Sequence, residues 1–77
     1  MNSRLRQIVA RVFNVAPDSL SPDSGPHSIS AWDSAGHLNL VLHIEKEFGV
    51  QFSEDEVVDM IDLATIEAAL QQRGVNH

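Results

Sequence analysis

The apolar residues between positions 38 and 48 constrain the fold of this chain more than any other feature of its sequence. On a helical wheel they spread over an arc of roughly 200 degrees. They are Leu38, Leu40, Val41, Leu42, Ile44 and Phe48. A helix at the surface of a globular protein needs an apolar stripe of only about 100 degrees. We therefore predict a central helix over residues 34–48 that several other elements contact, ended by Gly49 because glycine adopts positive φ readily.

Apolar spacing near the amino terminus predicts a first helix over residues 3–14, with Ser3 as its cap. The residues of its apolar stripe are Leu5, Ile8, Val9, Val12 and Phe13. Pro17 prevents the helix from continuing, because proline lacks an N–H and restricts the residue before it.

Two shorter helices are predicted after the central one. Ser53 and Glu56 have the spacing of a capping box, in which each side chain accepts a hydrogen bond from the backbone N–H of the other residue. The helix that they open is short and should end near Ile61.

The last helix is predicted to begin with Asp62 or Thr65 as its cap and to end at Gly74. Its inward-facing residues are Leu63, Ile66, Ala69 and Leu70. The final residues, 75–77, are expected to fray.

A long connection separates the first helix from the central one. Residues 15–33 contain three prolines, one glycine and five serines, and they show no helical or strand period, so they are predicted to form a loop with a short turn near residues 18–20. Leu20, Ile29 and Trp32 should be at least partly buried, since apolar side chains of an unattached loop would lie in water. The predicted fold is an all-α four-helix bundle, with a short third helix, in a single domain over residues 1–77.

Composition excludes several classes of function. The net charge of −6 argues against a nucleic acid partner, because phosphate neutralisation needs a clustered cationic surface. Proteins with basic surfaces are the expected partners instead. The chain has no cysteine, so it can form neither a disulfide framework nor a thiolate zinc site. No apolar run approaches the ~18 residues of a membrane span, and the cytoplasm is the expected compartment.

Ser34 is the candidate functional residue, because it stands where the central helix begins. A serine there also has a plain structural explanation, since its hydroxyl oxygen can cap the helix. No Gly-x-Ser-x-Gly turn or positioned histidine supports it as a catalytic nucleophile, so an enzyme acting alone is disfavoured. His37 and His43 lie about 240 degrees apart on the helical wheel, so they cannot bind a metal ion as an i, i+4 pair, and no metal site is expected.

Asp33 and Ser34 open an apolar helix that is followed by the run Glu-Lys-Glu-Phe-Gly-Val-Gln-Phe at residues 45–52. This pattern closely resembles the free-standing bacterial acyl carrier proteins, and the resemblance covers nearly the whole chain. It implies that Ser34 carries covalent 4'-phosphopantetheine, attached by a phosphopantetheinyl transferase that supplies the catalysis. It also implies that Asp33 is a cap or a contact for that transferase.

The same resemblance implies that the cofactor thiol carries acyl intermediates as thioesters in fatty acid, polyketide or related biosynthesis. The implied partners are acyl-activating, acyltransferase or ketosynthase-type enzymes with basic docking surfaces, and the implied carrier is a cytoplasmic monomer with the helical bundle fold.

The sequence departs from the family pattern in ways that bear on its partners. Ala35 stands where the family usually has leucine, and Trp32 with the run His-Leu-Asn-Leu at 37–40 is more similar to specialised carriers of secondary-metabolite or polysaccharide clusters. The residues on the expected exposed side of the central helix that replace acidic residues of fatty acid carriers are Gly36, Asn39 and Lys46. The acidic residues that remain are Asp33, Glu45, Glu47 and residues 54–56. We therefore expect a dedicated set of partner enzymes.

Two alternatives stay open at this point. The first is an aminoacyl or peptidyl carrier, including the D-alanyl type, although peptide synthetase carriers usually have glycines before the serine motif and this chain has Ala31 and Trp32. The second is a helical protein-interaction module in which Ser34 is only a helix cap.

Overall fold

The computed structural model describes residues 2–75 of the 77-residue chain. Its elements are α1 (Ser3–Phe13), the 3-10 turn η1 (Pro17–Ser19), α2 (Ser34–Phe48), α3 (Glu54–Asp59) and α4 (Leu63–Gln72). The described residues contain no β-strand. The prediction of an all-α bundle with a long first connection and a short third helix is confirmed.

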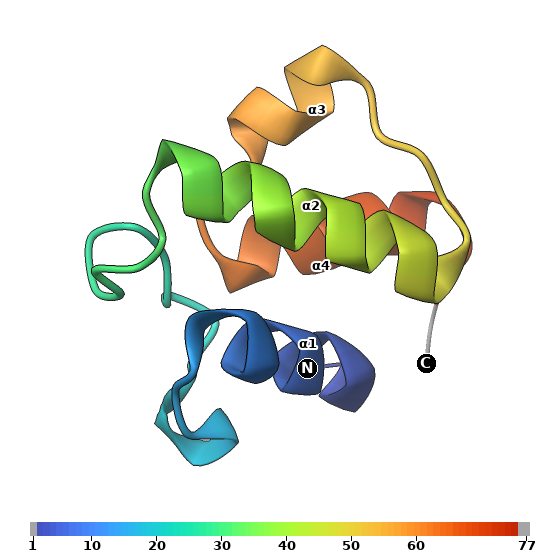
Figure 1. Cartoon of the computed structure of the whole chain (residues 1–77). Helices are drawn as coiled ribbons and strands as arrows, with labels where there is room; N and C mark the ends of the chain where they lie inside the picture. Colours follow the sequence, from blue (N-terminus) through green and yellow to red (C-terminus); the bar gives the residue numbers. More distant parts are fainter. Residues whose placement is uncertain (1, 76–77) are drawn as a thin grey trace.

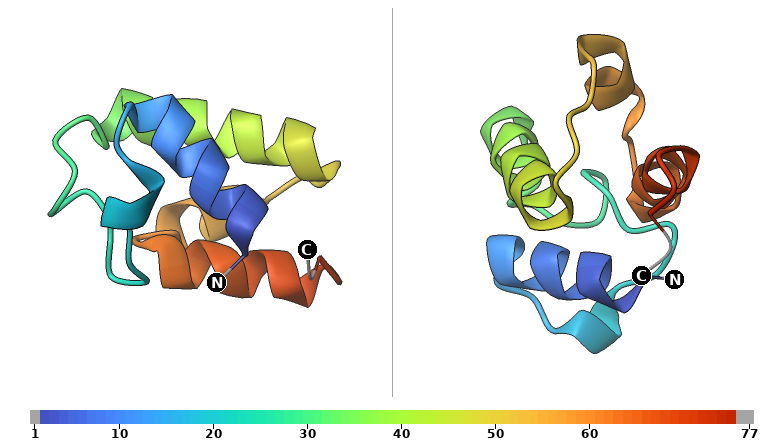
Figure 2. Two further views of the ribbon diagram at one scale, coloured as in Figure 1. Left: turned by 90° about the horizontal axis from the view of Figure 1, so that it is seen from below. Right: turned by 90° about the vertical axis from the view of Figure 1, so that its right-hand side faces the viewer.

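The central helix of the bundle is α2 (Figure 1). α1 runs antiparallel to α2, whereas α4 lies behind α2 in this view and runs in the same direction. α3 lies on the opposite side of α2 from α1, and the right-hand view of Figure 2 shows it above α2 and α4. The other three helices thus lie beside α2, whereas its outer side in the right-hand view of Figure 2 faces none of them.

The core is formed by apolar side chains from α1, α2, α4 and the long loop. Its most deeply buried members are Leu5, Val9, Trp32, Leu40, Ile44, Leu63, Ile66 and Leu70. The apolar face of α2 is not covered completely, because Leu38 and Leu42 are 59% and 64% exposed. α3, the element above this side of α2, has only six residues and buries none of them. Part of the predicted apolar face is therefore surface.

The predicted bounds of α2 are confirmed, and Gly49 ends this helix in the left-handed region at φ 67°. The predicted cap of α1 is wrong. Asn2, and not Ser3, caps α1, because its side-chain oxygen accepts hydrogen bonds from the N–H groups of Arg4 and Leu5 at 2.9 and 3.1 Å. Asparagine caps as well as serine does, and Ser3 is already the first helical residue.

Capping boxes open both of the shorter helices. Ser53 and Glu56 form the predicted box at the start of α3, but this helix ends at Asp59 because the next residue turns into the core. Asp62 caps α4 by accepting from the N–H of Thr65 at 2.8 Å, and the Thr65 hydroxyl accepts from the N–H of Asp62 at 3.1 Å. The two predicted alternatives for this cap therefore act together.

The end of α4 differs from the prediction. Val75 is buried, and its N–H donates to the Leu70 carbonyl at 3.1 Å. Gly74, at φ 79°, turns the chain back onto the helix, and its N–H donates to the carbonyl of Gln71 at 2.9 Å. This pair of bonds is the Schellman motif, which places an apolar residue against the last turn. The prediction that Val75 frays is therefore wrong, and residues 76–77 lie outside the described residues.

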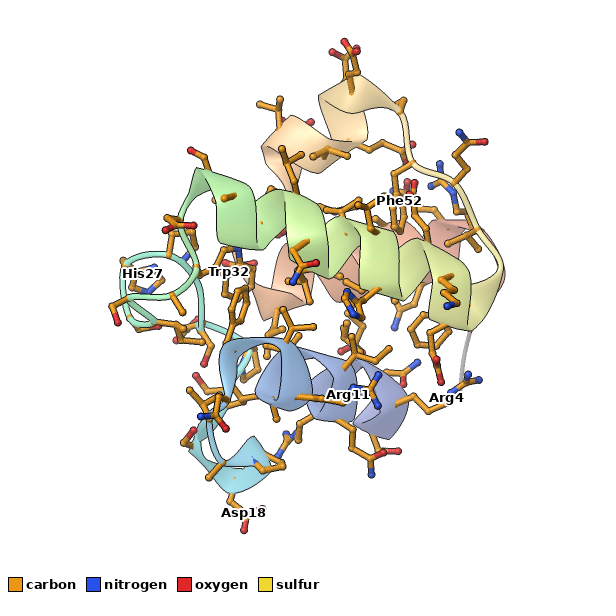
Figure 3. The ribbon with its side chains drawn as sticks, in the orientation of Figure 1. Arg4, Arg11, Asp18, His27, Trp32 and Phe52 are labelled. Atoms are coloured by element: carbon orange, nitrogen blue, oxygen red, sulfur yellow. The ribbon has the colours of Figure 1, made fainter. Side chains whose placement is uncertain are left out.

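The long loop is attached to the core at intervals, as predicted. Leu20 and Trp32 are buried and Ile29 is half-buried. The Trp32 ring stacks on Phe13 with 5.1 Å between the ring centroids, and Figure 3 shows Trp32 between α1 and the start of α2. The loop therefore contributes its largest side chain to the core.

The same loop also closes the start of α4. The carbonyl oxygens of Pro22 and Ser24 accept hydrogen bonds from the N–H groups of Ala64 and Leu63 at 3.1 and 3.0 Å. First-turn N–H groups have no partner within their own helix. Two of them in α4 are thus satisfied by a distant segment of the chain.

Two arginines join helices at the surface. Arg4 donates to the Glu47 carboxylate at 3.2 Å and links α1 to the end of α2; its side chain lies at that end of the bundle in Figure 3. Arg73 pairs with both carboxylate oxygens of Glu56 and links the end of α4 to α3. Arg73 also lies over the ring of Phe52, 4.7 Å from its centroid.

The Arg73 pair makes stability depend on pH. Hydrogen bonding to Arg73, together with the backbone N–H of Ser53, lowers the pKa of Glu56 from 4.5 to about 2. A depressed carboxylate pKa stabilises the fold above the unfolded pKa of 4.5, and this contribution is lost as the pH falls toward 2. In urea denaturation, wild type should therefore exceed Glu56→Gln in stability at pH 6, and the difference should shrink between pH 4.5 and pH 2. Glu54→Gln, in the same helical turn, is the control. An equal pH dependence of both variants would contradict the role of Glu56.

Candidate functional site

Ser34 is the first residue of α2, and it is exposed. The residue that caps this helix is Asp33, whose Oδ1 accepts a hydrogen bond from the Gly36 N–H at 2.8 Å. The prediction of Asp33 as a cap is confirmed, and the interpretation of Ser34 as the cap is wrong. The Ser34 hydroxyl is therefore not needed to close the helix.

The start of α2 suits a phosphate ester. Asp33 binds the N–H groups of Gly36 and His37 through its side chain and its carbonyl oxygen, respectively. The N–H groups of Ser34 and Ala35 belong to the first turn, where the helix itself offers no acceptor. These groups and the positive end of the helix dipole favour a phosphate by a few tenths to about 1 kcal/mol.

An apolar groove of about 600 Å³ begins beside Ser34 and runs between α2 and α3. Its lining residues are Pro26, Trp32, Asp33, Ser34, His37, Leu38, Val57, Val58, Met60 and Ile61. Three of them, Leu38, Val58 and Ile61, are large apolar side chains that are more than half exposed. The candidate attachment point thus lies at one end of an apolar surface.

His37 joins three segments at this groove. The indole N–H of Trp32 donates to His37 Nδ1 at 2.9 Å, and His37 Nε2 lies 2.8 Å from the Val57 carbonyl oxygen. The sequence predicts only a surface or boundary histidine here, and the half-buried position agrees with that. The contacts themselves were missed. The one available signal is that a buried tryptophan N–H needs an acceptor.

The sequence analysis places Gly36 on the exposed docking side of α2, and the structure shows that this position is not free. It is half-buried, and a Cβ atom placed on it would lie 2.2 Å from the Ala31 carbonyl oxygen and 3.1 Å from the Phe13 ring. An acidic side chain at this position would therefore collide with the loop. The long loop approaches α2 closely at this residue, and only glycine leaves room for it.

The other two positions on this side that replace acidic residues, Asn39 and Lys46, are exposed. Several of the acidic residues that the sequence offers for docking form bonds with other residues of this chain. These are Glu45, which accepts from the Phe52 N–H at 2.8 Å, and the arginine partners Glu47 and Glu56. Glu54 and Asp55, in the first turn of α3, stay exposed. Three of the acidic residues expected for docking thus already have partners within the molecule.

Within residues 2–75, no three His, Cys, Asp or Glu side chains gather closely enough to hold a metal ion. None of the helices in this part of the chain is long and apolar enough to cross a bilayer. The polar side chains that line the groove are those of Asp33, Ser34 and His37.

A family model described as a phosphopantetheine attachment site matches residues 3–71, from the first turn of α1 to the last turn of α4. This match covers most of the chain. Members of the family are carriers that a transferase modifies, rather than catalysts. An exposed serine, the adjacent first-turn N–H groups and the apolar groove fit such a cofactor. The chain therefore belongs to the phosphopantetheine attachment site family, and it is a carrier protein whose covalent cofactor is 4'-phosphopantetheine.

Proposed function

We propose that Ser34 carries the 4'-phosphopantetheine and that the protein transports acyl groups between the enzymes of a specialised biosynthetic pathway. The observation that carries this proposal is the exposed position of Ser34 at the start of α2, while Asp33 makes the capping bond. When bound, the cofactor supplies a thiol that holds an acyl group as a thioester. The chain cannot supply that thiol, because it has no cysteine.

Each residue at the start of α2 has a distinct task in this proposal. The Ser34 oxygen forms the ester bond to phosphorus, and the transferase supplies the base that takes its proton. Asp33 holds the first turn of the helix in place. The N–H groups of Ser34 and Ala35 face the added negative charge, which a helix start stabilises.

The apolar groove favours an acyl cargo over an aminoacyl cargo. The exposed side chains of Leu38, Val58 and Ile61 line the groove that begins beside Ser34. The free energy falls when an alkyl chain leaves water for such a surface. A charged ammonium group would lose its hydration there, which costs free energy unless a partner replaces the lost water. The groove therefore suits a carboxylic acid with an apolar body.

The missing cysteine makes this function easy to test. The purified chain is incubated with coenzyme A and a broad-specificity phosphopantetheinyl transferase, and both the intact mass and the thiol content are measured. The expected result is a mass increase of one phosphopantetheine group and the appearance of a titratable thiol, which the unmodified chain lacks. A chain that no competent transferase modifies would contradict the proposal.

The choice of partners is testable through charge on α2. Asn39→Glu combined with Lys46→Glu should improve turnover by fatty acid synthase enzymes. Both positions are exposed, so the basic docking surfaces of these enzymes would then meet acidic residues. The improvement should be largest at low salt, since the Debye length falls from about 30 Å at 0.01 M to about 10 Å at 0.1 M.

The matched control is Asn39→Gln with Lys46→Gln, which removes the lysine charge and adds no acid. Efficient turnover of the wild-type carrier by chain-elongating fatty acid enzymes would refute a dedicated pathway.

A further inference from the structure

The hydrogen bonds of His37 define the state of its imidazole. An indole N–H can only donate, so His37 Nδ1, which lies 2.9 Å from Trp32 Nε1, accepts and carries no hydrogen. The Val57 carbonyl oxygen can only accept, so Nε2, at 2.8 Å from it, carries the hydrogen and donates. The two bonds together require the tautomer that carries its hydrogen on Nε2. The imidazole connects the end of the long loop, the start of α2 and the middle of α3.

α3 depends on contacts with its neighbours, including the half-buried Val57 side chain on the core and the Glu56 pair with Arg73. It has six residues and buries none of them, whereas isolated helices shorter than about 12 residues are marginal in water. The capping box of Ser53 and Glu56 holds its start. In its middle, the Val57 carbonyl accepts from His37 and, at 3.3 Å, from the Met60 N–H. His37 is thus a side chain by which α2 holds the middle of α3.

The groove beside Ser34 is built on this connection. Trp32, His37 and Val57 all line it, and the Trp32 and His37 rings lie nearly parallel, with 18° between their planes and 6.2 Å between their centroids. We propose that His37 is a positioning residue, which fixes α3 and Trp32 against the start of α2 and thereby sets the shape of the groove next to Ser34. Its consequence for cofactor attachment rests on the function proposed above for Ser34.

Three substitutions of His37 test its bond with Trp32 and its bond with Val57 independently. His37→Asn keeps an acceptor at the position of Nδ1 and loses the donor to Val57. His37→Gln keeps a donor near the position of Nε2 and loses the acceptor for Trp32. His37→Phe keeps a ring against Trp32 and loses both bonds. The matched control is His43→Phe, because His43 is exposed on the same helix and its Nδ1 lies 2.9 Å from the Asn39 carbonyl oxygen of its own turn.

Nuclear magnetic resonance measures both bonds directly. Trp32 is the single tryptophan of the chain, so its indole N–H gives one signal. Solvent exchange of this N–H should rise about tenfold in His37→Gln and His37→Phe, as loss of one internal hydrogen bond predicts, and stay unchanged in His37→Asn. Amide exchange across α3 should rise about tenfold in His37→Asn and His37→Phe and stay unchanged in His37→Gln. His43→Phe should change neither.

Wild-type histidine nitrogen spectra at neutral pH provide a readout that needs no variant. They should show His37 with a hydrogen on Nε2 and none on Nδ1. The opposite tautomer would overturn the proposal, as would exchange rates that stay at wild-type values in His37→Phe. This spectrum decides the matter even where a variant fails to fold.

Cofactor attachment tests the consequence for function. The KM of the transferase for His37→Phe should rise about tenfold while kcat stays unchanged, because Ser34 itself remains on α2 and only the adjoining surface moves. A normal KM together with raised α3 exchange would overturn this part. A wild-type chain that is not modified at all would refute the function of Ser34 instead, and the spectra would still report on the His37 bridge.

Discussion

Ser34→Ala is expected to abolish attachment of phosphopantetheine completely while the protein stays folded. The hydroxyl is exposed, and Asp33 rather than Ser34 makes the capping bond of α2. Alanine also has a higher helix propensity than serine, so stability should stay the same or rise by a few tenths of a kcal/mol. Intact mass after treatment with transferase and coenzyme A measures the first effect, and thermal unfolding followed by circular dichroism measures the second.

Two other serines provide matched controls for this change. Ser53 begins α3 and does cap its helix, since its hydroxyl accepts from the Glu56 N–H at 3.2 Å. Ser53→Ala should therefore lose about 0.5–2 kcal/mol of stability and keep full modification. Ser30→Ala, in the exposed part of the loop, should change neither property. Modification of Ser34→Ala, or loss of modification in either control, would show that another residue carries the cofactor.

The second large effect is expected from Gly36→Ala, which should destabilise the protein although it places alanine in a helix. Helix propensity alone favours this change by about 0.5–1 kcal/mol. The added Cβ, however, would lie 2.2 Å from the Ala31 carbonyl oxygen. Backbone cannot move aside as a flexible side chain can, and overpacking of this kind costs about 1–3 kcal/mol. A domain of this size has only about 3–5 kcal/mol of net stability, so the loss is severe.

Asn39→Ala is the control for Gly36→Ala, because position 39 is exposed on the same helix and reports helix propensity alone. Urea denaturation of both variants gives the comparison. We expect Asn39→Ala to stay at or above wild-type stability, whereas Gly36→Ala falls below it. A more stable Gly36→Ala would mean that the loop does not pack against α2 at Ala31.

The helices could be predicted from the sequence because their signals are local. The bounds of α2 follow from the apolar run and from Gly49, and the start of α3 follows from Ser53 and Glu56. Some errors were local, such as the cap of α1, which is Asn2 and not Ser3, and others arose from the packing of the end and the surface of the bundle. Val75 is buried by a turn that depends on Gly74, and Leu42 stays exposed because α3 is too short to cover it.

The candidate site divides in the same way. Ser34 and Asp33 were found through a resemblance that rests on adjacent residues. Gly36 was misread as a free docking position because the Ala31 carbonyl that excludes a side chain there belongs to the loop. The hydrogen bonds of His37 to Trp32 and Val57 depend on how three segments lie relative to one another. The helical period of the sequence contains no information on that placement.

The contact between the long loop and α4 has a consequence for how this protein folds. Most helix caps are local and form together with their helix, as the box of Asp62 and Thr65 does. The first two N–H groups of α4 instead find their acceptors in residues 22–24, in the other half of the chain. The chain between residues 24 and 63 must close into a loop, which costs entropy, before these contacts can stabilise it. Contacts between distant residues therefore slow folding. The first turn of α4 therefore has these two hydrogen bonds only when the loop lies against it, so we expect the loop and this turn to become ordered together.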